Sequence, residues 1–404
     1  MTQNVDRAYD EAVKSGLLPG VSLLAGDKDG NILYSKSIGR ATAKEGRDLP
    51  FTADTICTIA SMTKLMTSVA VLQCVEDKVL DLDTNVRPQL PEMGKYGVIT
   101  SFDDDKSSAT FAPDSTHITL RMLLSHTSGH EYDWLNVLLG KWRASRNEEP
   151  WTGPTIEHKS AIPLAFTPGT GFAYGSGHDW AGKLVEKASG LNLDEFMRIR
   201  IWKPLGIEND ITFWPSTKDN IKGRMADMSR LDQNGNPPAV DASDYDIMFG
   251  ATDCIGGGGI YCSTKAYYTF LSAVLRRDPK LLTLRSYDEL FRPQLNKECE
   301  QALNNYIALS PAHTNFLGQG IPASVRKTWS FAGLIAKEGQ EGRFERGTAF
   351  WAGVANTVWF IDREAGICGT AFCQLLPPLH PPVIALHEKF QRGVFEKAKG
   401  ARVD

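Results

Sequence analysis

The chain has 404 residues, of which 42% are hydrophobic and 23% are charged, and its formal net charge is −4. This length and composition are typical of one soluble globular body in two lobes. No cluster of basic residues has the density that nucleic-acid binding needs, and no apolar run is long enough to cross a bilayer. We therefore expect neither a nucleic-acid nor a membrane partner.

The cysteines and the N-terminal segment bear on the cellular location. Seven cysteines are spread thinly along the chain, and none shows CxxC spacing. The first residues, "MTQNVDRAYDEAV", are polar and helical, unlike a secretory signal. These features predict reduced, buried thiols and a cytoplasmic protein.

Secondary structure is predicted in chain order from hydrophobic patterning. Residues 3–15 read as an amphipathic helix, and two apolar runs around "DKDGN" read as a hairpin. A helix is expected over 61–78, and residues 84–200 read mostly as helical patches and loops. That region includes a short apolar helix in "HITLRMLLSHTSG" and a helix over 179–190. Strands return in "TAFWAGVANTVWFID" and "GICGTAFCQLL", followed by a C-terminal helix that begins with proline.

This distribution places β structure at both chain ends and helices between them. It predicts an α/β (α+β) fold with one antiparallel sheet built from both ends and flanked by helices, plus a large, mainly helical domain. We expect residues 1–85 and 250–404 to form the sheet domain and residues 86–249 the helical domain. The active site should lie in the cleft between them.

Ser61 and Lys64, in "TIASMTKLMTSVAVLQ", are three residues apart at the start of the predicted helix. One helical turn puts both side chains on the same face, near the positive end of the helix dipole. A lysine can remove the proton of a serine hydroxyl if burial or a neighbouring cation lowers its pKa. The spacing alone is weak evidence, because an N-cap serine with a solvated lysine looks the same. A second such pair, Ser324 and Lys327, is expected to be surface sequence.

Tyr174 adds to the case for catalysis. It lies in "PGTGFAYGSGHDWAGKLVEKASG", on a glycine-rich turn just before a helix. Cationic neighbours can lower the pKa of a tyrosine, which can then act as a base or a proton shuttle. The alternative is a buried aromatic residue whose hydroxyl is simply satisfied.

These motifs together resemble the serine β-lactamase-like superfamily. Ser-x-x-Lys is followed about 110 residues later by Tyr-x-Ser, and then by a strand of small residues near the C-terminus. "ITLRMLLSHTSG" and "PLGI" are similar to landmarks of the class C branch and its related esterases and acyltransferases. "LQCVEDKVLDLD", "DWAGKLVEKASGL" and "ANTVWFID" resemble the lovastatin-biosynthesis acyltransferases and statin-type side-chain esterases.

The resemblance implies catalytic roles. Ser61 would be the nucleophile that becomes acylated, while Lys64 and Tyr174 would share the removal and return of its proton. The backbone N–H groups of Ser61 and Val354 match the oxyanion-hole positions, where loss of one donor typically costs about a hundredfold or more in rate.

Two positions depart from the lactamase pattern. Where lactamases and penicillin-binding proteins carry Lys-Thr-Gly, this chain reads Trp351-Ala352-Gly353, so the lysine expected to hold a β-lactam carboxylate is missing. Related carboxylesterases have Trp-Gly-Gly there. Trp351 is either a pocket wall or a core aromatic residue. Ser176 fills the place of the family's asparagine, which puts its role in substrate positioning in doubt.

Further candidates concern substrate binding. Tyr132 and Trp134 could wall an acyl or ring pocket or simply pack in the core. Lys159 aligns roughly with a basic position of the statin acyltransferases, so we expect it to meet a substrate carboxylate; the alternative is a solvated loop lysine.

Other chemistries lack their signatures. "CIGGGGIYCS" has neither Rossmann nor phosphate-loop spacing, and it is expected to let the backbone pass close to the nucleophile helix or the site. The histidines make no HExxH pattern, so we expect no metal and no cofactor. GxSxG is absent, which argues against the α/β-hydrolase fold.

The expected function is that of a serine hydrolase with a Ser61 acyl-enzyme, acting on the side-chain ester of a bulky polyketide or statin-type small molecule. The first alternative is an acyltransferase that moves a short acyl group onto a polyketide alcohol, with an acyl-carrier protein as a partner if one delivers the chain. A β-lactamase or D-alanyl peptidase is the second. A non-catalytic binding or scaffold protein would keep the fold without the chemistry.

Overall fold

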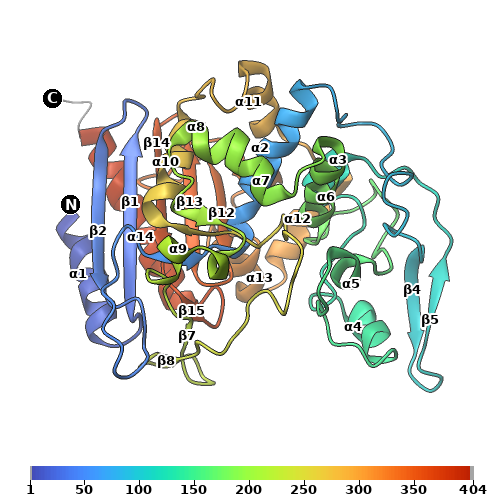
Figure 1. Cartoon of the computed structure of the whole chain (residues 1–404), viewed down its shortest axis with the longest axis horizontal. Helices are drawn as coiled ribbons and strands as arrows, with labels where there is room; N and C mark the ends of the chain where they lie inside the picture. Colours follow the sequence, from blue (N-terminus) through green and yellow to red (C-terminus); the bar gives the residue numbers. More distant parts are fainter. Residues whose placement is uncertain (1, 401–404) are drawn as a thin grey trace.

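The computed structural model describes residues 2–400. Its centre is a seven-stranded antiparallel sheet with the strand order β10-β11-β12-β13-β14-β1-β2, so both ends of the chain build one sheet (Figure 1). This confirms the predicted fold. The strands of this sheet are β1 (Gly20–Asp27), β2 (Ile32–Gly39), β10 (Lys327–Trp329), β11 (Leu334–Ala336), β12 (Ala349–Gly353), β13 (Thr357–Asp362) and β14 (Ile367–Phe372).

Helices cover both faces of this sheet. Phe390 of α14 (Pro381–Gly400) packs on Phe360, whereas Tyr267 of α10 (Thr264–Leu275) packs on Phe372. Phe360 is paired with Gly369, and Phe372 lies three residues further along β14, so it points to the opposite face. α14 and α10 therefore lie on opposite sides, and α1 (Thr2–Lys14) packs beside α14.

The middle of the chain is mainly helical, as expected. Residues 120–189 lie to the right of the sheet in Figure 1, whereas the helices within residues 193–222 overlap the sheet in that view. The helices of the middle region are α3 (Leu120–Leu124), α4 (Val137–Ala144), α5 (Ile156–Ser160), α6 (Gly177–Ser189), α7 (Leu193–Met197), α8 (Lys203–Leu205) and α9 (Asp219–Lys222). Further helices precede the later strands: α11 (Leu284–Phe291), α12 (Lys297–Ala308) and α13 (Pro311–Phe316).

One hairpin in this middle region was not predicted. β4 (Val98–Asp103) and β5 (Ser108–Ala112) pair antiparallel at the far right of Figure 1, where the sequence indicated helices and loops. Most of their side chains are half-buried or exposed, so the strands lack the alternation of apolar and polar residues that would reveal them.

Short strands join the middle of the chain to the two ends. β3 (Ile56–Thr58) and β6 (Ile211–Thr212) flank β9 (Tyr261–Ser263), and β7 (Ser229–Arg230) pairs with β8 (Val240–Asp241) and β15 (Leu375–Leu376). Residues 211–241 thus pair with both the early and the late segments of the chain. The domain boundary predicted at residues 249/250 is not marked by a break in strand pairing, and the two-domain division stays a prediction.

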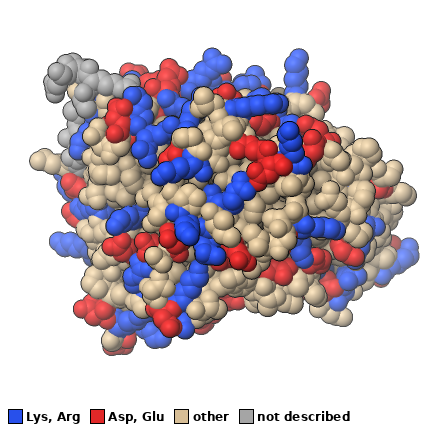
Figure 2. All heavy atoms as spheres, turned by 45° about the horizontal axis from the view of Figure 1, so that its top comes forward, with Lys and Arg blue, Asp and Glu red and all other residues tan. Residues whose placement is uncertain are grey.

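The surface and the cysteines fit the composition. On the face drawn in Figure 2, basic and acidic side chains are interspersed, as a net charge of −4 suggests. All seven cysteines are buried with free thiols, which confirms that part of the prediction. Among residues 2–400, no helix has the length and hydropathy of a membrane span.

Candidate active site

Ser61 lies on a 3-10 turn, Ala60–Met62, between β3 and helix α2 (Thr63–Glu76). The expected helix therefore begins two residues after Ser61. Ala60 has a φ of 41°, a conformation that costs an alanine energy and that occurs most often at functional sites. α2 is buried along nearly its whole length, which fixes the position of the turn against the rest of the protein.

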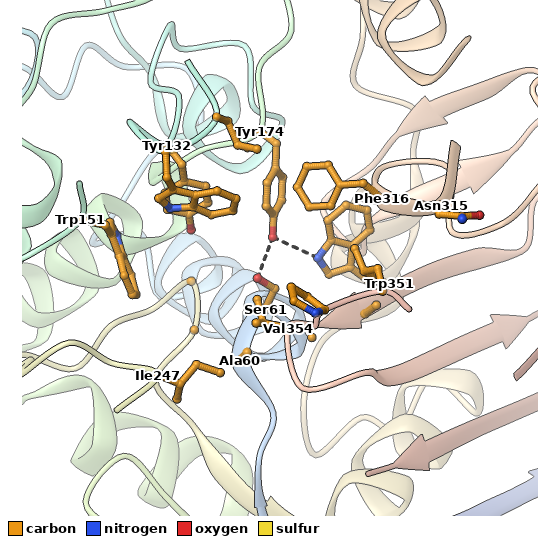
Figure 3. A pocket seen from close by; sticks show the side chains of 18 of the residues that line it. Ala60, Ser61, Tyr132, Trp151, Tyr174, Ile247, Asn315, Phe316, Trp351 and Val354 are labelled. Atoms are coloured by element: carbon orange, nitrogen blue, oxygen red, sulfur yellow. Dashed lines mark hydrogen bonds between the residues drawn. The ribbon is translucent and has the colours of Figure 1, made fainter. Parts of the chain in front are cut away.

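Two side chains donate hydrogen bonds to the Ser61 hydroxyl. The Tyr174 hydroxyl lies 2.7 Å from Ser61 Oγ, and Lys64 Nζ lies 3.2 Å from the same atom. Trp351 Nε1 in turn donates to the Tyr174 hydroxyl at 3.3 Å (Figure 3). The structure thus brings together the three residues that the sequence predicted to be catalytic, and it adds the indole of Trp351 behind the tyrosine.

Lys64 is buried and makes two further contacts. Its Nζ donates to the Gly257 carbonyl at 2.7 Å and to the Tyr132 hydroxyl at 3.4 Å. The ammonium also lies 4.7 Å from the centroid of the Tyr174 ring. Tyr132 is therefore more than a pocket wall. The sequence did not reveal its contact with Lys64, because the two residues are 68 positions apart and share no motif.

A buried carboxylate lies near Lys64 and shares Gly257 as a partner with it. Asp179, in the first turn of α6, accepts the Gly257 N–H at 2.6 Å through Oδ1. Burial raises the pKa of Asp179 to about 6, although the charge of Lys64 and this hydrogen bond act in the opposite direction. Sequence analysis placed Asp179 only near a helix start and missed it as a site residue.

The surroundings of Gly257 explain one glycine in the run of four. A Cβ at this position would lie 2.6 Å from Asp179 Oδ1 and 3.3 Å from Lys64 Nζ. The backbone can therefore contact both charged groups only because residue 257 has no side chain. The prediction that the glycine-rich segment passes close to the site is confirmed.

Two histidines pack behind Tyr174. The ring of His126 lies 4.8 Å from that of Tyr174 and 5.3 Å from that of His178. Burial holds the pKa of both histidines well below the usual value, and the charge of Lys64 lowers it further. They are neutral packing groups at physiological pH. Among residues 2–400, no group of three or more His, Cys, Asp or Glu side chains is placed to hold a metal ion.

Ser61 opens onto a cavity of about 610 Å³. Besides Ser61, five residues predicted for binding or for the oxyanion hole line it: Tyr132, Trp134, Trp351, Gly353 and Val354. Figure 3 shows aromatic side chains on several sides of Ser61. Both alternatives for the aromatic residues hold in part, because Trp351 and Tyr132 are buried yet contribute to the cavity wall.

Strand β12 runs directly past the nucleophile turn. A Cβ on Gly353 would lie 2.3 Å from the Ile59 carbonyl oxygen, so only glycine allows this approach. β11 pairs with β12 at Ala349 and Phe350 only, which leaves the following stretch, residues 351–353, beyond the last pair. Val354 and Ser61 both line the cavity, and the oxyanion-hole role of their N–H groups stays a prediction.

Lys159 does not lie where a substrate contact requires. Its side chain is 1% exposed, and Nζ donates to the carbonyls of Trp151 at 3.0 Å and Phe249 at 3.1 Å. Burial lowers its pKa. The lysine lies behind the cavity wall and is absent from the lining, so the predicted contact with a substrate carboxylate is wrong for this structure. The alternative of a solvated loop lysine is wrong as well.

Two other expectations need correction. Ser176 is 2% exposed, precedes α6 and does not line the cavity, so it cannot touch a substrate there. Lys327, expected on the surface, is fully buried in β10 and donates to the Pro322 carbonyl. The pair Ser324–Lys327 nevertheless forms no second site, because Ser324 is exposed and Lys327 is held by that carbonyl.

A serine that receives hydrogen bonds from a lysine and a tyrosine at the floor of an apolar cavity defines a serine-dependent acyl-transferring enzyme. The chain belongs to the beta-lactamase family, whose model, described as "Beta-lactamase", matches residues 5–391.

Similar proteins narrow this class. A lovastatin esterase from Penicillium rubens is 33% identical over 97% of this chain and 98% of its own length. A monacolin J acid methylbutanoyltransferase from Aspergillus terreus is 35% identical over 97% of this chain and 95% of its own length. The solved structure of a mutant simvastatin synthase from Aspergillus terreus has a TM-score of 0.89 and 32% identity, and the match covers 98% of this chain and 95% of that one. The protein is thus an enzyme of the serine hydrolase and acyltransferase type that acts on a small molecule.

Proposed function

We propose that the protein hydrolyses the side-chain ester of a bulky polyketide or statin-type molecule through an acyl-enzyme on Ser61. The observation that carries this proposal is the position of Ser61 Oγ, held by Tyr174 at 2.7 Å and Lys64 at 3.2 Å, at the floor of the cavity of about 610 Å³. Cavities of this size hold drug-sized ligands and are usually mostly apolar.

In the first half-reaction, the Ser61 hydroxyl attacks the ester carbonyl and passes its proton to the Tyr174–Lys64 pair. In this proposal the backbone N–H groups of Ser61 and Val354 donate hydrogen bonds to the developing oxyanion. The same proton then goes to the departing alcohol. In the second half-reaction, water attacks the acyl-enzyme and loses a proton to the same pair. The pair returns this proton to Ser61 Oγ as the bond between Oγ and the acyl group breaks and the acid leaves.

Acyl transfer is the second candidate. It differs only in the acceptor, because an alcohol then replaces water in the second half-reaction. The cavity volume supports it, since the space beside an acylated Ser61 can hold an alcohol. The similar proteins include both an esterase and a methylbutanoyltransferase at nearly equal identity.

A β-lactam is a weaker candidate substrate. The strand that carries Lys-Thr-Gly in lactamases reads Trp351-Ala352-Gly353 here, and no lysine or arginine lines the cavity among the described residues. We expect nitrocefin to remain unhydrolysed under conditions in which esters are turned over.

The test is to incubate the protein with lovastatin acid, with and without monacolin J acid as acceptor, and to follow the products by mass. Release of free 2-methylbutanoic acid, lost in Ser61→Ala, would support the hydrolase. Transfer to the added alcohol faster than hydrolysis would favour the transferase. If no activated ester acylates Ser61, both the hydrolase and the transferase are refuted.

A further inference from the structure

The lining of the catalytic cavity contains no ionisable acid or base among the described residues, apart from tyrosine hydroxyls. Its side chains are apolar or aromatic, with the exception of the Ser61 hydroxyl and the amides of Asn315 and Gln319. No aspartate, glutamate, lysine, arginine or histidine of the described chain contributes to the wall. The uncharged residues labelled around Ser61 in Figure 3 show this character from close by.

The two lysines beside the cavity, Lys64 and Lys159, are already hydrogen-bonded to other groups of the protein. Lys64 donates to Ser61, to the Gly257 carbonyl and to the Tyr132 hydroxyl, and the buried Asp179 lies close enough for the two charges to interact. Lys159 lies behind the wall, where two carbonyls accept from its ammonium. Both ammonium groups thus already have hydrogen-bond partners in the protein, and neither lysine lines the cavity.

Arg343 is a further cation near the cavity. It lines a separate cavity of about 40 Å³ that shares Gln319, Trp351 and Leu379 with the catalytic one. Arg343 Nε donates to Gln391 at 2.7 Å, and the guanidinium lies 3.5 Å from Glu388. This space is of the order of one water molecule, and the charge of Arg343 already faces a carboxylate.

We propose that the cavity selects esters that are uncharged in both the acyl and the alcohol part. This proposal rests on the proposed function and names its substrate class. A carboxylate that enters this cavity loses its water and finds no partner of opposite charge, whereas a neutral group of the same shape loses far less. The neutral form of a substrate should therefore be turned over faster than its ionised form.

The experiment compares lovastatin hydroxy acid with its primary carboxamide. The two compounds share the acyl group, the alcohol and the open chain, and they differ in one charge at pH 7.5. We expect kcat/KM for the carboxamide to be higher by about tenfold or more, in line with the cost of an unpaired buried charge. Equal values, or a preference for the acid, would overturn the proposal. If the acid were preferred and Arg343→Gln abolished the preference for the acid, the small cavity beside Arg343 would be the carboxylate site.

A second pair of compounds keeps the test open if both statin derivatives are inert. The mono-4-nitrophenyl ester of glutaric acid and the corresponding ester of its carboxamide carry the same difference in charge on the acyl side. The same ratio is expected, and equal rates would overturn the proposal. Lack of Ser61-dependent turnover of all four compounds would instead remove the proposed function, and this inference with it.

A matched pair of variants tests the origin of the selectivity. Gln319→Lys and Gln319→Met both remove the side-chain amide that donates to the Phe316 carbonyl, and they differ mainly in charge. We expect the lysine variant to shift the carboxamide-to-acid ratio toward the acid by about fivefold or more relative to the methionine variant. An unchanged ratio would mean that the carboxylate does not meet this lining, which contradicts the proposal.

Discussion

At the scale of single residues, the Ser61 hydroxyl lies between two unequal partners. Tyr174 is the closer one, at 2.7 Å, and its own hydroxyl is oriented by the Trp351 indole. Lys64 lies 3.2 Å from Ser61 Oγ and divides its donors among three acceptors. This arrangement favours Tyr174 as the group that handles the serine proton directly, while the ammonium of Lys64 lies 4.7 Å from the centroid of its ring.

The first prediction follows from this difference. Tyr174→Phe should lower kcat/KM for 4-nitrophenyl butanoate by about 10²–10⁴-fold, the usual range for loss of a general acid or base. Tyr132→Phe is the matched control, because its hydroxyl contacts Lys64 only at 3.4 Å; the expected loss is below about tenfold. An equal loss in both variants would move the base role to Lys64 and the hydroxyls around it.

The second prediction concerns Lys159. Its ammonium holds the carbonyls of Trp151 and Phe249, whose φ angles are 53° and 48° and whose rings meet 6.0 Å apart at the cavity wall. Lys159→Met leaves two carbonyls without their donor and releases two strained residues, so the wall should loosen.

We expect kcat/KM for a bulky ester to fall in Lys159→Met by about tenfold more than for a small 4-nitrophenyl ester, in line with the effect of misplaced positioning groups. Lys159→Gln retains an amide donor. Its kcat/KM for the bulky ester should lie between that of Lys159→Met and that of the parent protein. Equal losses for large and small esters would show that the lysine stabilises the fold without shaping the wall.

Sequence reasoning found the residues that sit in motifs and missed those that meet only in space. Ser61, Lys64 and Tyr174 follow from spacing and order along the chain. The roles of Asp179 and Gly257 could not be predicted in this way, because carboxylates near helix starts and glycines in loops are common in proteins of every function. Lys159 shows the opposite failure, since its position along the chain suggested a ligand contact but its burial directs the ammonium away from the cavity.

At the scale of elements, the glycine-rich segment 256–259 connects helices α2 and α6 at the active site. Gly257 donates its N–H to Asp179 on α6 and offers its carbonyl to Lys64 on α2, so this one residue links the two helices. The same scale separates what hydrophobic patterning can and cannot show. α14 was predicted closely because it buries one face, and α6 because Gly190 marks its end. The hairpin β4–β5 buries too little to leave a pattern.

The third prediction compares neighbouring glycines. Gly257→Ala places a Cβ 2.6 Å from Asp179 Oδ1, which must push the carboxylate or the segment away from Lys64. In Gly258→Ala the nearest atom is 3.9 Å away, an ordinary contact. We expect Gly257→Ala to lower kcat by about a hundredfold, as misplacement of catalytic groups does, and Gly258→Ala to stay within a few-fold of the parent. A similar loss in both variants would contradict the role given to Gly257.

At the scale of the whole molecule, stability and catalysis compete for the same interior. The site keeps Asp179 and Lys64 buried where helices α2 and α6 pack together. Buried charges rarely stabilise a fold more than apolar residues of the same size would, so the protein carries these two at some expense of stability. Asp179 makes this cost measurable, because its pKa differs between the folded and the unfolded chain.

The fourth prediction is the pH dependence of that cost. Burial raises the pKa of Asp179 from 3.8 to about 6, so between these values the folded protein binds the proton more strongly than the unfolded chain does. The contribution of Asp179 to stability therefore falls as the pH rises from 4 to 6, and above 6 the full penalty, on the order of 1–3 kcal/mol, remains. Asp179→Asn keeps an oxygen acceptor for the Gly257 N–H and cannot ionise.

The variant Asp179→Asn should thus raise the free energy of unfolding at pH 7 by on the order of 1–3 kcal/mol, and this gain should shrink as the pH falls toward 4. Urea unfolding at a series of pH values measures both effects. Asp133→Asn is the control of opposite sign, because Asp133 pairs with the buried Arg143 at 2.8 Å and its removal should destabilise the protein at pH 7. A loss at pH 7 would show that the attraction of Lys64 outweighs the burial of the Asp179 carboxylate. A gain that does not change with pH would show that the ionisation of Asp179 does not cause the penalty.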